Sequence, residues 1–135
     1  MPEINKKILA LALDLTRQSP RSPQTLLGGY ALAARALDKC RAALAGRAGP
    51  YHFNCPVDRI FLNFTGINLQ EFEEFVATGA SDSEAAAWIR MKSHVKNPTL
   101  VAAWSVLLRL NPVLYVLNID DWMYARESQS HTEGR

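Results

Sequence analysis

Proline and glycine residues divide this chain into short segments, and that division constrains the fold more than any other feature of the sequence. The breaks fall at residues 19–23, residues 49–50, Gly66, Gly79 and residues 97–98. Each proline disfavours helix at the residue before it, and glycine readily ends a helix. Between the breaks, apolar residues recur three and four positions apart, which is the period of an amphipathic helix. We therefore expect short helices joined by tight loops.

Local signals indicate where several of these helices begin and end. Helix starts are marked by capping residues or by a proline in the first turn. These signals are the pairs Asn68–Glu71 and Ser81–Glu84 and the prolines Pro56 and Pro98. Gly46 and Gly66 are placed to end the helices before them. Tyr30, after the break at residues 28–29, is expected to begin the second helix.

The apolar stripes predict which side of each helix faces a shared core. They comprise Ile4, Ile8, Leu11 and Leu15; Tyr30, Ala33, Leu37, Cys40 and Leu44; Val57, Ile60, Phe61 and Phe64; Leu69, Phe72, Phe75 and Val76; Ala85, Trp88, Ile89 and Val95; and Leu100, Trp104, Leu107, Leu108 and Asn111. The expected fold class is all-α, a single compact domain of about six short helices. We expect the domain to span residues 1–127, with a disordered tail over 128–135.

The apolar run from Val113 to Leu117 allows two structures. Its β-branched residues suit a strand, but no second strand is predicted in this chain. The run is therefore either helical or irregular, which we favour, or extended and paired with its own copy. In the second case the chain would form a homodimer through the segment from Val113 to Trp122.

Length and composition are those of an ordinary globular domain. The chain has 135 residues, of which 48% are hydrophobic. Two cysteines, Cys40 and Cys55, are too few for a disulfide framework, which favours reduced thiols in a cytoplasmic protein. The apolar run after Lys7 is too short for a signal peptide, and no stretch approaches the roughly 20 apolar residues of a membrane span. We therefore expect a soluble protein that does not enter a membrane.

The charge is unevenly distributed along the chain. Residues 1–47 hold eight Lys and Arg against three Asp and Glu, a net of +5, whereas the remainder holds seven against ten, a net of −3. Such asymmetry can orient an anionic small molecule or an acidic protein partner. A nucleic-acid partner needs a denser basic stripe with exposed aromatic residues, and the sequence has neither. No pattern predicts a cofactor.

An ordered set of short motifs resembles a known family. The set, in chain order, is Asp14-Leu15-Thr16, Pro20-Arg21-Ser22-Pro23, Leu27-Gly28-Gly29-Tyr30, Leu37-Asp38-Lys39, Tyr51-His52-Phe53-Asn54-Cys55-Pro56, Phe64-Thr65-Gly66-Ile67 and Gly79-Ala80-Ser81-Asp82. Together these motifs resemble the bacterial family catalogued as domain of unknown function 5069. The resemblance reaches from Asp14 to about Asp121 and implies a free-standing bacterial cytoplasmic protein. It brings no established activity, so no catalytic residue carries over.

Residues 51–58 combine polar and nucleophilic side chains at an expected helix start. A thiol at such a position can be activated by the helix dipole, and His52 could serve Cys55 as a base. The simpler interpretation is that Asn54 or Cys55 caps the helix while the aromatic neighbours pack. His52, Cys55 and Asp58 have a spacing that permits metal ligation, but no further histidine or Cys-x-x-Cys motif supports a metal site, and we predict none.

Two arginines in a proline-stiffened loop are the second candidate feature. Arg17 and Arg21 could grip a carboxylate or phosphate, and the backbone of Gly28 and Gly29 could contribute N–H groups. An ordinary solvated loop explains the same residues. Asp38 with Arg41 is expected to form a surface pair of little energetic value.

Two functions follow from these observations, and the catalytic residues of any enzyme remain unknown. The favoured one is a binding or protein-interaction module. The alternative is a small enzyme or small-molecule-binding protein with an anion-accepting pocket. That pocket is expected to be lined by Arg17, Arg21, Tyr30, His52, Asn54 and Cys55. It requires the arginine loop and residues 51–55 to face one cavity.

Overall fold

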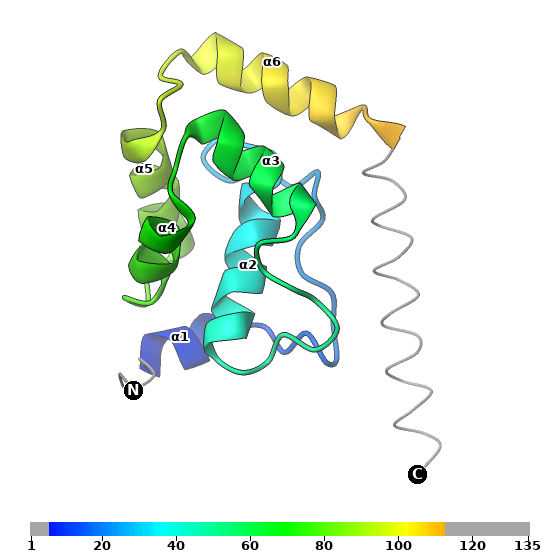
Figure 1. The fold of residues 1–135 in the computed structure, drawn as a ribbon, viewed down its shortest axis with the longest axis vertical. Coiled ribbons are helices and arrows are strands. Elements are labelled where there is room, and N and C mark those ends of the chain that lie inside the picture. The colour runs from blue at the N-terminus through cyan, green and yellow to red at the C-terminus, as the bar shows by residue number, and fades with distance from the viewer. Residues whose placement is uncertain (1–5, 113–135) are drawn as a thin grey trace.

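The computed structural model describes residues 6–112, and over this range the chain forms six helices and no strand (Figure 1). The helices are α1 (Lys6–Leu11), α2 (Ala33–Leu44), α3 (Pro56–Thr65), α4 (Leu69–Val76), α5 (Asp82–Lys92) and α6 (Pro98–Arg109). The predicted all-α fold of a single compact domain is confirmed. The run from Val113 to Leu117, the proposed dimer segment and the predicted tail lie outside the described residues.

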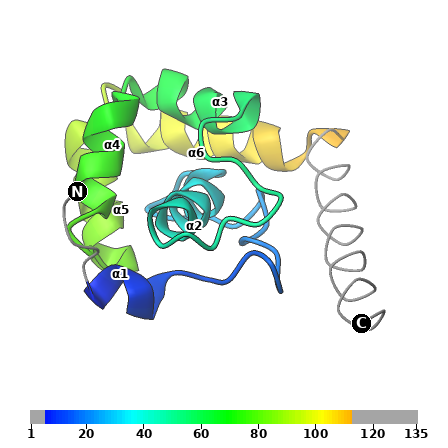
Figure 2. The ribbon, with the colours of Figure 1, turned by 60° about the horizontal axis from the view of Figure 1, so that its bottom comes forward.

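Helix α2 is the centre of the molecule. Seen nearly along its axis in Figure 2, it is surrounded by the other helices and by the loops between them. Each of its residues from Ala33 to Ala42 is buried. A helix buried on all sides is usually apolar all round, but α2 also carries four charged residues, which need partners inside the protein.

Contacts between aromatic rings join several helices to the core beside α2. Phe61 and Phe72 are fully buried and contact each other edge to face, with ring centroids 6.1 Å apart. Trp104 of α6 stacks on Phe64 of α3 at 4.1 Å. Edge-to-face and stacked arrangements are those that aromatic rings prefer. These contacts attach α3, α4 and α6 to one core.

Most of the predicted helix ends are confirmed. The Ser81–Glu84 capping box begins α5, Asn68 and Asn97 accept hydrogen bonds at the starts of α4 and α6, and Gly66 ends α3. Gly66 has φ of 73°, and an added Cβ would lie 2.4 Å from a ring carbon of His94. That position therefore needs glycine both for its backbone conformation and for its contact.

The structure corrects several predicted faces and boundaries. The first helix ends at Leu11, and Leu15 enters the core from a loop, where its N–H donates to the carbonyl of Arg47. The second begins only at Ala33, because residues 27–30 form a tight turn closed by two backbone hydrogen bonds. Side chains expected in the core but exposed include Leu11, Ile60, Leu100 and Leu107. None of the helices over residues 6–112 is long and apolar enough to cross a membrane.

Helix α6 uses a different face from the one its apolar residues suggested. Its buried residues are Val101 and Ser105. The Ser105 hydroxyl donates to the carbonyl of Gly29 at 2.8 Å and accepts from the N–H of Ala31 at 3.1 Å. A buried hydroxyl is stable only when such partners are present. Because Ser105 lies on the buried side of α6, much of the apolar surface of this helix faces outward.

Candidate functional site

Ion pairs connect the charged residues of α2 to three separate segments. Asp38 accepts from the backbone N–H of Arg21 and twice from its guanidinium, at distances from 2.8 to 3.0 Å. The same guanidinium donates to Asp82 at 2.7 Å. The Asp38 and Asp82 carboxylates hold the pKa of Arg21 above its ordinary value, against the opposing effect of burial. Arg21 therefore lies in a network of ion pairs that fixes its loop.

Arg41 extends this network from the other side of Asp82. Its guanidinium donates to Asp82 at 2.9 Å and to the carbonyl of Ala80 at 2.8 Å. Burial acts to raise the pKa of Asp82, but the hydrogen bonds and charges of Arg21 and Arg41 outweigh it and lower that pKa. The predicted surface pair of Asp38 with Arg41 is wrong, because both residues are buried and each contacts a distant segment.

Lys39 makes the third connection, at the start of α3. Its ammonium donates to Asp58 at 2.9 Å and lies 3.1 Å from the sulfur of Cys55, with both charged residues almost fully buried. Asp58 also accepts from the backbone N–H groups of Asn54 and Cys55. Cys55 is the N-terminal cap of α3, as one of the two interpretations expected. Sulfur, ammonium and carboxylate thus lie together beside a helix N-terminus.

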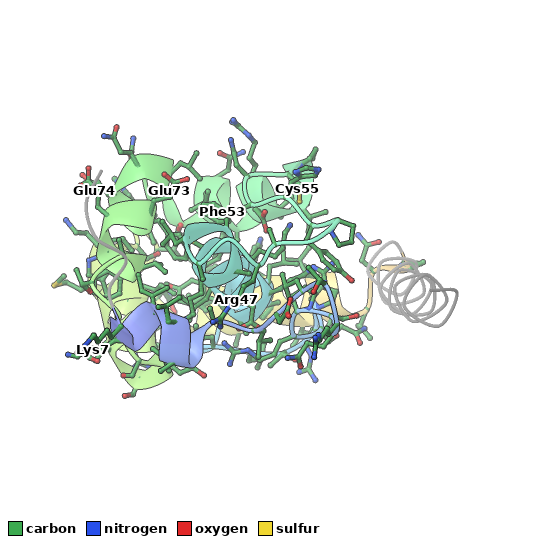
Figure 3. All side chains as sticks on the ribbon, turned by 90° about the horizontal axis from the view of Figure 1, so that it is seen from below. Lys7, Arg47, Phe53, Cys55, Glu73 and Glu74 are labelled. Atoms are coloured by element: carbon green, nitrogen blue, oxygen red, sulfur yellow. The ribbon has the colours of Figure 1, made fainter. Side chains whose placement is uncertain are left out.

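Two positions near this cluster carry unusual features. Asn54 has φ of 76°, and its buried side-chain oxygen has no hydrogen-bond partner among the described residues. Cys55 is half-buried at the beginning of α3, on the opposite side of the molecule from Lys7 (Figure 3). Both cysteines are free thiols, and Cys40 is buried in the core, where burial raises the pKa of its thiol.

The other predicted site residues are spread over the surface and the core. Arg17 is exposed and pairs with Asp14 at 3.7 Å, whereas His52 is exposed beside the aromatic Tyr51. Tyr30 is buried, and its hydroxyl donates to the carbonyl of Val95 at 3.3 Å. The arginine loop and residues 51–55 do meet, since the hydroxyls of Ser19 and Tyr51 lie 3.3 Å apart. That contact brings the two segments together around α2 without placing all six residues at one cavity.

A separate cavity of about 380 Å³ lies between α6 and residues 26–30. Gly28 and Gly29 form part of its wall, and both have positive φ, at 62° and 92°. A Cβ added to Gly28 would lie 3.3 Å from Ala86 of α5, so the loop packs tightly there. Of the six residues predicted to bind a ligand, Tyr30 is the one that lines this cavity.

Helix α6 forms the longest wall of the cavity. Its lining residues are Pro98, Val101, Ala102, Ser105, Val106 and Arg109. Their spacing of three and four positions places them on one helix face over its whole length. Leu26 and Val95 complete the apolar part of the wall. Volumes of roughly 300–1,000 Å³ with mostly apolar walls are typical of small-molecule pockets.

The charged residues of the cavity are all basic. They are Arg90, Lys96 and Arg109, and none of the lining residues is acidic. The Lys96 ammonium donates to the carbonyls of Arg90 and Met91 at the end of α5. Among residues 6–112, no carboxylate forms an ion pair with Arg90 or Arg109. This cavity therefore differs from the surroundings of α2, where Arg21, Lys39 and Arg41 are paired with carboxylates.

Sequence reasoning missed these basic residues because each looks like an ordinary solvated residue near a helix end. One signal in the sequence was usable. A stripe on α6 that includes small and polar residues lies apart from the predicted apolar face of that helix. No group of three or more metal-ligating side chains is found within the described part of the chain.

Comparison with known proteins places this chain in a family. The family model described as Domain of unknown function (DUF5069) matches residues 17–112. No curated protein matches the chain. Since the family match covers more than half of the sequence, the chain belongs to the DUF5069 family. The resemblance based on the ordered motifs is confirmed.

Proposed function

We propose that this DUF5069 member binds a small anionic molecule with an apolar body in the cavity beside α6. One observation carries the proposal: three basic side chains and no acidic one line an otherwise mainly apolar cavity of about 380 Å³. Apolar surface supplies affinity when it leaves water, and a few well-placed charges orient the ligand. The chemistry is that of the anion-accepting pocket predicted from the sequence, at a different place in the fold.

The pairing of charges elsewhere supports this choice. Inside the domain, Arg21, Lys39 and Arg41 each have a carboxylate partner, so their charge is satisfied by the protein. Arg90 and Arg109 have no such partner among the described residues and face a cavity with apolar walls. An acidic ligand would supply the missing countercharge, and a guanidinium binds a carboxylate or phosphate through two parallel hydrogen bonds.

Native mass spectrometry of gently purified protein tests the proposal directly. We expect a non-covalent adduct of small mass that is lost under denaturing conditions. The adduct should be lost or strongly reduced in the double variant Arg90→Gln, Arg109→Gln, because both countercharges are then removed.

Arg59→Gln provides the matched control, since Arg59 is an exposed arginine on α3 that does not line the cavity. The control should retain the adduct at the wild-type level. The absence of any small adduct from the wild type, combined with failure to bind added apolar anions, would contradict the proposal.

A second candidate function rests on the outer face of α6. Leu100, Leu107 and Leu110 are between 57% and 71% exposed, and contiguous apolar surface of this kind commonly contacts another protein. A second copy of this chain is the proposed occupant. The predicted dimer segment from Val113 to Trp122 follows α6 directly in the sequence, so the apolar surface and that segment are adjacent along the chain.

Analytical ultracentrifugation separates this candidate from the first. The interaction function predicts a concentration-dependent dimer that Leu107→Glu converts to a folded monomer. Thr99→Glu, on the exposed surface at the start of the same helix, is the control for added charge. A wild-type protein that stays monomeric at all concentrations would contradict this second candidate function.

A further inference from the structure

The α6 cavity is a groove with basic residues at both ends, and we infer that its ligand is an elongated molecule with an apolar middle and an acidic group at each end. This inference rests on the proposed function and adds the shape and charge of the ligand. It is carried by the order of the lining residues along α6 and by the positions of the three cations.

The length of the groove follows from helix geometry. The lining residues of α6 begin at Pro98 and end at Arg109, so they cover the entire helix. With a rise of 1.5 Å per residue, these eleven steps correspond to about 16.5 Å. The groove is therefore elongated along the helix axis.

The cations divide between the two ends of this length. Arg90 and Lys96 lie at the connection between α5 and α6, where the Lys96 ammonium contacts the carbonyl of Arg90. Arg109 is the last residue of α6. The side-chain amide of Gln24 donates to the carbonyl of Arg109 at 2.9 Å, which attaches the loop before Leu26 to this end.

The middle of the groove is apolar. Val101, Ala102 and Val106 lie between the two ends, and Leu26 faces them from the loop. The hydroxyl of Ser105 is already bonded to Gly29 and Ala31, so it adds little polarity to the wall. A ligand segment placed here gains free energy by being apolar.

Calorimetric titration with decanedioate and decanoate tests this inference. The two molecules share one chain length and differ by the second carboxylate. We expect the dianion to bind about tenfold more tightly, because a charge-assisted contact contributes roughly one such factor. In a series of dicarboxylates, affinity should pass through a maximum at a length that reaches both ends.

Arg109→Gln is the decisive variant, since Arg109 is the single cation among the lining residues at its end of the groove. The substitution keeps the backbone carbonyl that Gln24 contacts. We expect decanedioate to lose its tenfold advantage while decanoate keeps its affinity through Arg90 and Lys96. Arg59→Gln should leave both affinities unchanged, and thermal unfolding should show that both variants are folded.

The outcomes separate this inference from the function on which it rests. Equal binding of decanedioate and decanoate by the wild type, both weakened by Arg90→Gln, would overturn the two-ended ligand and keep the anion pocket. Failure of both molecules and of the whole dicarboxylate series to bind would overturn the two-ended ligand, and together with the absence of a small adduct in native mass spectrometry it would overturn the anion pocket as well.

Discussion

Helices α2 and α6 both have twelve residues, but the surroundings of their charged side chains differ. In α2, the four charged side chains are buried and contact groups elsewhere in the protein. In α6, the terminal Arg109 faces a cavity without a carboxylate partner in the described chain, and Leu107 and Leu110 are mainly exposed. Charges satisfied within the chain hold its segments together, whereas unsatisfied charges beside an apolar cavity are available to a ligand.

The buried pairs of α2 contribute specificity more than stability. Replacing a buried ion pair by well-packed apolar residues is often neutral, because the cost of desolvation offsets the attraction. Removing one partner is expensive, however, since an uncompensated charge then remains inside. Arg21, Asp58 and Asp82 each pair with a charged residue of α2, so the network fixes one loop and the starts of α3 and α5 around that helix.

The largest predicted difference between the two regions is in the stability lost when a single cation is removed. Lys39→Met leaves Asp58 buried without its cation and should lower the free energy of unfolding by about 3–5 kcal/mol. Arg90→Met removes an exposed cation at the cavity and should change the free energy of unfolding by less than about 0.5 kcal/mol. Urea denaturation measures both. Similar losses for the two variants would break the distinction between paired and available charges.

Leucine truncation should show the same contrast in packing. Leu37 of α2 is fully buried, so Leu37→Ala is expected to cost about 2–5 kcal/mol through lost burial and a residual cavity. Leu107 of α6 is 71% exposed, and Leu107→Ala should cost less than about 0.5 kcal/mol. The same denaturation experiment applies. A large loss for Leu107→Ala would mean that this face is covered within the folded chain.

The pH dependence of stability should report the Asp82 network. Its pKa is lowered in the folded protein, so its contribution is present above the ordinary value of 3.8 and is lost as the pH falls through the lower folded value. Because Asp82 is about half exposed, Asp82→Asn should cost about 1 kcal/mol or less near neutral pH. The difference from the wild type should shrink as the pH falls below 3.8. A stability difference between the variant and the wild type that stays constant across this pH range would contradict the lowered pKa of Asp82.

Thiol chemistry should distinguish the two cysteines without affecting stability. Cys40 is buried with a raised pKa, whereas Cys55 is half-buried beside the ammonium of Lys39. A disulfide reagent should therefore modify one thiol of the native protein, and Cys55→Ser should remove that reaction. Modification should be equally fast with decanoate present, since Cys55 does not line the cavity. Protection by decanoate would place the ligand near α3 instead.

Local features of this fold could be predicted from the sequence, and long-range ones could not. The caps at Asn68, Ser81 and Asn97 were predictable because the bonded groups lie within three residues. The pairs of α2 join residues 17, 19 and 41 positions apart, and a charged residue on a helix usually indicates a solvated face. Nothing local distinguishes Lys39 from an exposed lysine.

The position of the candidate cavity could not be predicted from the sequence. An anion pocket in the first half of the chain was expected because the motifs are dense there. In the structure the residues of those motifs, Arg21 and Cys55 among them, mostly contact α2 or one another. The cavity joins residues 26–30 to α6, about 75 positions later. Of its basic residues, Arg90 lies on α5, Lys96 in the connection between α5 and α6, and Arg109 at the end of α6.

The most direct test of the central distinction is an amide NMR titration of the wild-type protein with decanoate. The account predicts saturable shifts for Gly28, Gly29, Val101 and the residues around Arg90 and Lys96, with the amides of α2 and of residues 51–58 unmoved. Shifts centred on residues 17–21 and 51–58, or no saturable shift at all, would contradict it.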